Sequence, residues 1–125
     1  MSSLEVRAVA IAGVVALAAC GHVDRRDVVA LRGGSANRGK LAIARYGCNT
    51  CHAISGFPDP TVLVAGPVTG IARRAYIAGT LPTTRRNLVM WIRFPHQVKP
   101  QTAMPDLGVS AGEARDIAAY LYSLR

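Results

Sequence analysis

The sequence predicts an all-α fold of three to five short helices. Residues 41–46, 88–93 and 110–124 combine helix-forming residues with apolar positions three and four apart. Between these segments, Gly, Pro and Thr interrupt every alternating apolar run after a few residues, so no strand is expected. Aromatic residues make up only 6% of the 125-residue chain. A protein core alone would be thin, which favours a buried non-protein group that adds apolar surface.

The N-terminal segment has the features of an export signal. Residues 1–7 are polar, and residues 8–19 form an uninterrupted run of small and aliphatic residues. A helix of this length rises about 18 Å, which is too short for a hydrocarbon core of ~30 Å. Residues 1–19 are therefore predicted to be a secretory signal peptide.

This signal ends in Leu17-Ala18-Ala19-Cys20, which resembles the bacterial lipobox. In that motif the cysteine is lipidated and the chain is cleaved in front of it. The alternatives are an ordinary signal peptide cut after Ala19 and an uncleaved anchor. We favour lipidation of Cys20, because the small residues and the cysteine coincide at the end of the apolar run.

A flexible tether is predicted for residues 20–37, which mix charges with glycine and serine and show no sustained periodicity. One short helical turn is expected within it, at residues 28–31. The domain proper is predicted over residues 38–125. The signal and the lipid place it on the periplasmic side of a bacterial membrane.

The first helix of the domain is expected at residues 41–46, with Asn37 as its cap. It leads directly into Cys48. Residues 53–84 are rich in Gly, Pro and Thr and are predicted to be a loop, with a short helical stretch at residues 71–75.

Two further helices follow. Asn87 is expected to cap residues 88–93, which end before Pro95. Ser110 is expected to cap the last helix, with Glu113 at the reciprocal position of a capping box. The last helix presents one apolar face, formed by Ile117, Tyr120, Leu121 and Leu124.

Residues 48–52 have the pattern Cys-x-x-Cys-His, which is typical of covalent haem attachment. Thiols three residues apart on one turn reach the two vinyl groups along one porphyrin edge. The adjacent His52 then places its imidazole under the iron. We therefore expect one haem c, attached through Cys48 and Cys51, with His52 as the proximal iron ligand.

Two other uses of these cysteines are less well supported. A thioredoxin-like redox pair is expected between a strand and a helix, whereas this motif follows a helical pattern. A structural zinc site requires further paired ligands, and only His22 and His96 remain, neither of them paired. The number of cysteines agrees with covalent haem attachment. Of the 3 cysteines, one is assigned to the lipid and two to the porphyrin, so none is left over.

The second axial ligand is predicted to be Met104. It lies in a loop between Pro100 and Pro105, and a stiff loop presents a thioether at low entropic cost. His96 is the alternative ligand. Met90 is expected to be core filler in an amphipathic helix.

Over about residues 38–125, the chain resembles the class I cytochromes c. The residues that carry this resemblance are the haem motif, Gly66-Pro67, the spacing from Leu88 to Met104, and the closing residues 116–121. The resemblance implies the cytochrome c fold, in which the last helix crosses the first.

The resemblance also assigns further site residues. The Pro67 carbonyl would accept the ring N–H of His52 and so fix the orientation of the imidazole. Arg73 and Arg74 follow a glycine, as does the family's basic residue near a haem propionate, and either arginine could fill that role. Trp91 stands where the family often has a tyrosine near the methionine sulfur.

The first helix departs from the family pattern. The positions where the family has glycine and an aromatic residue are Lys40 and Ala44 here, and Gly39 and Ile43 keep the same spacing one residue earlier. The helix crossing is therefore expected to be shifted or to use Tyr46.

The formal net charge is +8, from 15 Lys and Arg against 7 Asp and Glu. No nucleic-acid-binding motif accompanies it, and basic and aromatic residues do not alternate, so no nucleic-acid partner is expected. A basic surface fits acidic redox proteins or anionic lipid. Basic residues flank the segments nearest the methionine side and are candidates for steering a partner: Arg85, Arg86, Arg93 and Lys99.

With His52 and Met104 both bound, the iron would have no open position for a substrate. The sequence therefore predicts a membrane-anchored electron carrier and not an enzyme. The first alternative is a fixed haem c subunit of a larger respiratory oxidase or dehydrogenase. The second is a haem enzyme or gas sensor, which needs an open sixth site.

Overall fold

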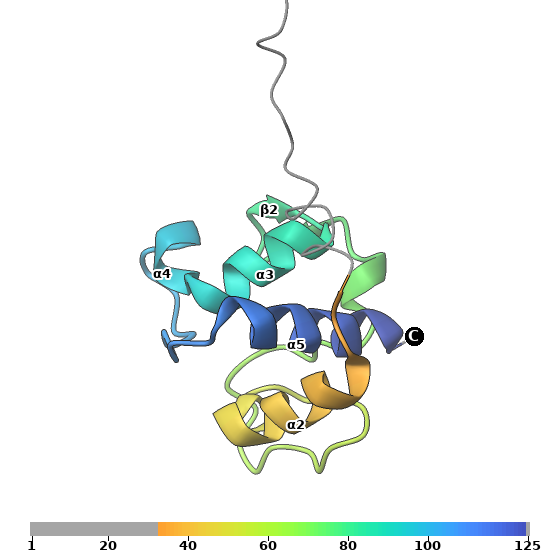
Figure 1. Cartoon of the computed structure of the whole chain (residues 1–125). Coiled ribbons are helices and arrows are strands. Elements are labelled where there is room, and N and C mark those ends of the chain that lie inside the picture. Colours follow the sequence, from red (N-terminus) through yellow and green to blue (C-terminus); the bar gives the residue numbers. More distant parts are fainter. Residues whose placement is uncertain (1–32, 125) are drawn as a thin grey trace, which may run out of the picture.

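Helix α5 (Ala111–Ser123) lies between α2 (Ala36–Tyr46) and α3 (Arg85–Arg93) and packs against both (Figure 1). The computed structural model describes residues 33–124. The predicted signal peptide, the predicted lipidation site Cys20, most of the predicted tether and the helical turn expected at residues 28–31 lie outside this range. None of the helices within residues 33–124 is long and apolar enough to cross a membrane.

The crossing of α2 and α5 depends on glycine. A Cβ atom at Gly39 would lie 2.0 Å from the carbonyl oxygen of Asp116, so the two backbones approach as closely as glycine permits. Ile43, one turn later, is completely buried in the core. The crossing is thus shifted to Gly39 and Ile43. Tyr46 contributes a hydrogen bond instead, from its hydroxyl to Oε2 of Glu113 at 2.7 Å.

The helices begin earlier than the sequence predicts. Ser35, not Asn37, caps α2, and its Oγ accepts the backbone N–H of Arg38. Thr84, not Asn87, caps α3. In both cases the hydroxyl directly before the helix accepts a backbone N–H from three residues later, which satisfies one donor of the first turn.

The capping box predicted at the start of α5 is confirmed. The backbone N–H of Glu113 donates to Ser110 Oγ at 3.3 Å, and the backbone N–H of Ser110 donates to Glu113 Oε2 at 3.4 Å. Two donors at the helix start are satisfied reciprocally.

A small hairpin departs from the all-α prediction. Strands β1 (Tyr76–Ile77) and β2 (Leu81–Pro82) pair antiparallel, with Ile77 opposite Leu81. The turn between them contains Ala78 and Gly79, both at positive φ (54° and 72°). Two-residue strands are too short to show an alternating pattern, so periodicity alone does not reveal them.

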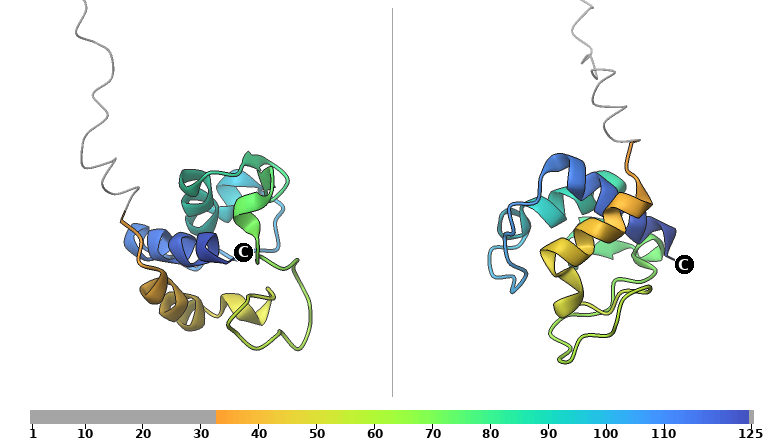
Figure 2. Two further views of the ribbon diagram at one scale, coloured as in Figure 1. Left: turned by 90° about the vertical axis from the view of Figure 1, so that its right-hand side faces the viewer. Right: turned by 60° about the horizontal axis from the view of Figure 1, so that its bottom comes forward.

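The remaining helical turns are short. The 3-10 turns are η1 (Cys48–Thr50) and η2 (Ile71–Arg73), and the second lies within the stretch predicted at residues 71–75. Helix α4 (Pro95–Val98) follows α3 after one residue, because proline suits a first helical turn better than an interior one. The loop between η1 and η2 projects from the body of the domain near α2 (yellow-green in Figure 2).

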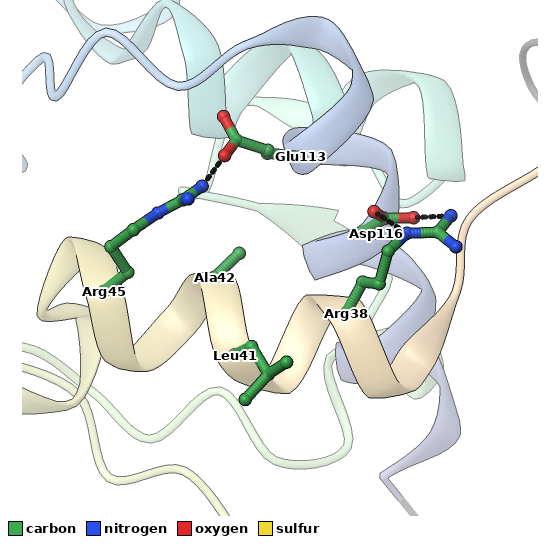
Figure 3. Close-up of a pocket in the computed structure, with 6 residues that line it drawn as sticks. All are labelled: Arg38, Leu41, Ala42, Arg45, Glu113 and Asp116. Atoms are coloured by element: carbon green, nitrogen blue, oxygen red, sulfur yellow. Dashed lines mark hydrogen bonds and ion pairs between the residues drawn. The ribbon is translucent and has the colours of Figure 1, made fainter.

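Two ion pairs join α2 to α5 across a surface groove that also contains the exposed Leu41 (Figure 3). Arg45 pairs with Glu113. Arg38 donates to both carboxylate oxygens of Asp116, at 2.8 and 3.0 Å. The backbone N–H of Ser35 donates to the same carboxylate at 2.7 Å. Asp116 is therefore buried with its oxygens satisfied.

The contacts of Asp116 predict an acid-dependent stability. Its hydrogen bond from Arg38, more than any other influence, holds the pKa of the carboxyl below its ordinary value of about 3.9. A group with a lowered folded-state pKa stabilises the fold above the unfolded pKa and loses this effect as pH falls through the folded value. We expect Asp116→Asn to lower the free energy of unfolding at pH 7.

Urea unfolding at several pH values measures the effect. The difference between the parent and Asp116→Asn should be constant above about pH 5 and shrink below about pH 4. Asp106→Asn is the matched control, since Asp106 is an exposed carboxylate whose contact is a local turn, and it should change stability little. A difference for Asp116→Asn that grows on acidification would contradict the assignment.

Candidate functional site

The cysteine motif begins where α2 ends. Gly47 ends the helix in the left-handed conformation, with φ of 68°, and turns the chain into η1. The backbone N–H of His52 then donates to the Cys48 carbonyl at 3.1 Å, which closes one helical turn over the motif. Cys48 and Cys51 are half-buried free thiols. Burial raises the pKa of the Cys48 thiol, so this thiol is neutral at pH 7.

Residues 65–68 run alongside the cysteine motif and are hydrogen-bonded to it. The Ala65 N–H donates to the Cys51 carbonyl, and the Val68 N–H donates to the Ala53 carbonyl, both at 3.1 Å. Between these two bonds, Nδ1 of His52 lies 2.8 Å from the Gly66 carbonyl oxygen. A carbonyl can only accept, so Nδ1 carries the proton of this bond and Nε2 is left to act as a metal ligand.

The acceptor for His52 is thus Gly66, and the role predicted for Pro67 is wrong in this structure. The Pro67 carbonyl instead accepts a hydrogen bond from the guanidinium of Arg74. The backbone bonds on either side fix which carbonyl of the loop faces the ring. Gly66 was missed because the sequence offers no signal for a register difference of one residue.

An apolar cavity brings the predicted residues together. Cys48, His52, Met104 and Trp91 all line it. The rest of the lining is aliphatic and comes from α2, α3, α5, η2 and the loops, and no charged side chain takes part: Ile43, Ile54, Val68, Ile71, Leu88, Ile92, Leu107, Val109, Ile117 and Leu121. Cys51 is half-buried on the same turn as Cys48 but does not line the cavity.

Met104 reaches this cavity from the loop between α4 and α5. Its backbone N–H donates to Thr102 Oγ1 at 3.2 Å, a local turn that restrains the loop. The alternative ligand, His96, is exposed on α4 and does not line the cavity. Met90 is 45% exposed, so the prediction that it fills the core is wrong.

Arg73 and Arg74 are both exposed, and neither lines the cavity. The Arg73 guanidinium lies close to Gly70, 3.2 Å from where a Cβ atom would stand. Arg74 is held at Pro67, next to the residue that binds the imidazole. The Arg74 side chain therefore contacts the loop that holds His52, whereas the Arg73 side chain lies beside Gly70.

The donor set suits a haem better than a bare metal ion. Within residues 33–124, no three His, Cys, Asp or Glu residues gather as metal ligands. A porphyrin supplies four nitrogens itself, so the protein would need to add at most two ligands, and the imidazole of His52 and the thioether of Met104 line one cavity. An uncharged apolar lining also suits a macrocycle. The residues present fit a covalently attached haem.

No family model matches the chain. The chain is 36% identical over 92 residues to cytochrome c oxidase subunit 2 of Alkalihalophilus pseudofirmus. The match covers 72% of this chain and 26% of the relative, so the chain spans about a quarter of that protein's length.

Proposed function

We propose that this chain is a c-type haem domain that transfers electrons as a non-catalytic subunit of a respiratory oxidase complex. The observation that carries the haem proposal is the apolar cavity lined by Cys48, His52 and Met104. The similarity to an oxidase subunit supports the association with a complex. The fold we propose is that of the class I cytochromes c, with α5 crossing α2.

Each protein group has a defined task. Cys48 and Cys51 would hold haem c through thioether bonds, and His52 and Met104 would bind its iron. When bound, the haem supplies reversible one-electron chemistry. The Gly66 carbonyl keeps the imidazole in one tautomer and one orientation. The aliphatic lining would exclude water, and ligation by both His52 and Met104 would leave no position for a small molecule on the iron.

The location we propose is the periplasmic side of a bacterial membrane. Its support is the apolar run at residues 8–19 and the lipobox-like residues that end in Cys20. The predicted tether boundary at residue 37 is wrong, because α2 begins at Ala36. A lipid at Cys20 and the residues between it and Gly33 would keep the domain near a membrane-bound partner.

A free shuttle is the second candidate, because a net charge of +8 suits brief docking on acidic redox proteins. A haem enzyme or gas sensor has less support, since Met104 lines the same cavity as His52. The two leading candidates differ in how strongly the chain stays with its partner.

One purification tests the proposal. Native membranes are solubilised, the chain is captured at high salt, and a denaturing gel is stained for haem. Haem that migrates with this chain supports covalent attachment, and co-purifying oxidase subunits support the complex. A haem-stained chain recovered alone favours the shuttle. A chain without haem stain from a host that matures c-type cytochromes contradicts the haem proposal.

A further inference from the structure

The carboxylate of Glu113 joins the start of α5 to the end of α2. Its Oε2 accepts the Tyr46 hydroxyl at 2.7 Å and the Ser110 hydroxyl at 2.6 Å. Its Oε1 pairs with the Arg45 guanidinium (Figure 3), which also lies 5.3 Å from the centre of the Tyr46 ring. We call these four residues the Glu113 cluster. Both carboxylate oxygens are engaged, so one side chain fixes two helix ends that are far apart in the sequence.

On the α2 side, the Glu113 cluster lies next to the cysteine motif. Tyr46 is the last residue of α2, and only Gly47 separates it from Cys48. Tyr46 and Cys48 are both half-buried and pack against the hydrophobic core. The hydrogen bond of the Tyr46 hydroxyl therefore holds the chain at the point where α2 turns into the motif.

On the α5 side, the cluster fixes the end of the methionine loop, residues 103–109. Ser110 caps α5 and directly follows Val109, which is buried and lines the same cavity as Met104. The Arg93 Nε of α3 donates to the Val109 carbonyl at 3.4 Å. In the described part of the chain, the other hydrogen bonds of this loop are local turns. The position of Met104 therefore depends on how the end of its loop is held.

We propose that Glu113 is a positioning residue that holds the methionine loop against the cysteine motif and so keeps Met104 opposite His52. This inference rests on the proposed function, because it needs a haem bound between these two residues. Glutamine at position 113 would keep the length of the side chain but exchange one acceptor oxygen for a donor. It could not accept from all the partners of the carboxylate, so the two helix ends would be held less firmly.

The test measures how readily imidazole displaces methionine from the haem-loaded, oxidised protein. Imidazole and Met104 would compete for one position, so weaker binding of Met104 raises the apparent affinity for imidazole. We expect Tyr46→Phe, which removes one hydroxyl, and Glu113→Gln to raise this affinity roughly three- to tenfold, the change that corresponds to one hydrogen bond. The absorption band of thioether-ligated ferric haem should disappear at correspondingly lower imidazole concentrations.

Asp116→Asn is the matched control. Asp116 is the other carboxylate of α5 that binds α2, but its partner Arg38 lies about two turns before Tyr46, at the far end of the helix. This variant should lower stability and leave the imidazole affinity unchanged.

An equal rise in imidazole affinity for Asp116→Asn would show that Glu113 acts only through general helix packing, and would overturn the inference. Unchanged affinity in both Tyr46→Phe and Glu113→Gln would overturn it as well. A haem-loaded parent protein that lacks the thioether band would instead overturn the proposed function itself.

Discussion

Replacing Met104 with alanine is expected to produce a reduced protein that binds carbon monoxide, whereas the parent protein binds little. Met104 lines the same apolar cavity as His52, and in the proposed haem site its thioether would be the second ligand of the iron. Alanine leaves that position open, and the apolar lining around it admits an uncharged gas. Carbon monoxide titration of the reduced protein, followed by absorption spectroscopy, measures the change.

Two variants serve as controls for Met104. Met90→Ala removes an exposed methionine from α3 and should leave the protein unreactive. His96→Ala tests the alternative ligand, which is exposed on α4, and should also have no effect. Carbon monoxide binding by the parent, or an open site in His96→Ala, would contradict the assignment of Met104.

The second large effect is expected at the helix crossing. Gly39→Ala places a methyl group where the nearest atoms are the backbone oxygen and carbon of Asp116, at 2.0 and 2.5 Å. Neither atom can rotate away, so the helices must separate. We expect a loss of about 2–3 kcal/mol of stability, which exceeds what alanine gains in helix propensity. The midpoint of thermal unfolding should fall by at least roughly 10 °C.

Gly112→Ala is the matched control for this substitution. Gly112 also lies in a helix, but a Cβ atom there would meet only the end of the Arg115 side chain, at 4.0 Å. Alanine should therefore raise stability by about 0.5–1 kcal/mol. A loss of stability for Gly39→Ala and a gain for Gly112→Ala would support the close crossing. Equal gains in stability for the two variants would show that α2 and α5 do not approach through Gly39.

Three predicted site residues, Cys48, His52 and Met104, line one cavity, whereas the partner predicted for His52 is wrong. Cys48, Cys51 and His52 follow from spacing within a single turn, and Met104 follows from a loop bounded by prolines. The acceptor for His52 depends on how two distant segments align. The sequence places Pro67 there, whereas the backbone bonds of the loop place Gly66.

The same distinction holds for the helices. The capping box at Ser110 and Glu113 is a local pattern and was predicted correctly. The start of α2 was not, because Ser35 is fixed by a carboxylate that lies 81 residues away in the sequence. The small hairpin also depends on tertiary packing. Ile77 is buried in the core, but its two-residue strand is too short to show an alternating pattern.

The contact between Ser35 and Asp116 has a mechanical consequence. The described part of the chain begins at Gly33, and within two residues its backbone is bound to the carboxylate of α5. Gly34 lies against the same helix, where a Cβ atom would be 2.2 Å from the carbonyl oxygen of Arg115. A force pulling on the N-terminal side is therefore carried first by the α2–α5 junction. The residues that hold His52 come later in the chain, so a pull on the N-terminal end acts on the α2–α5 junction before it reaches them.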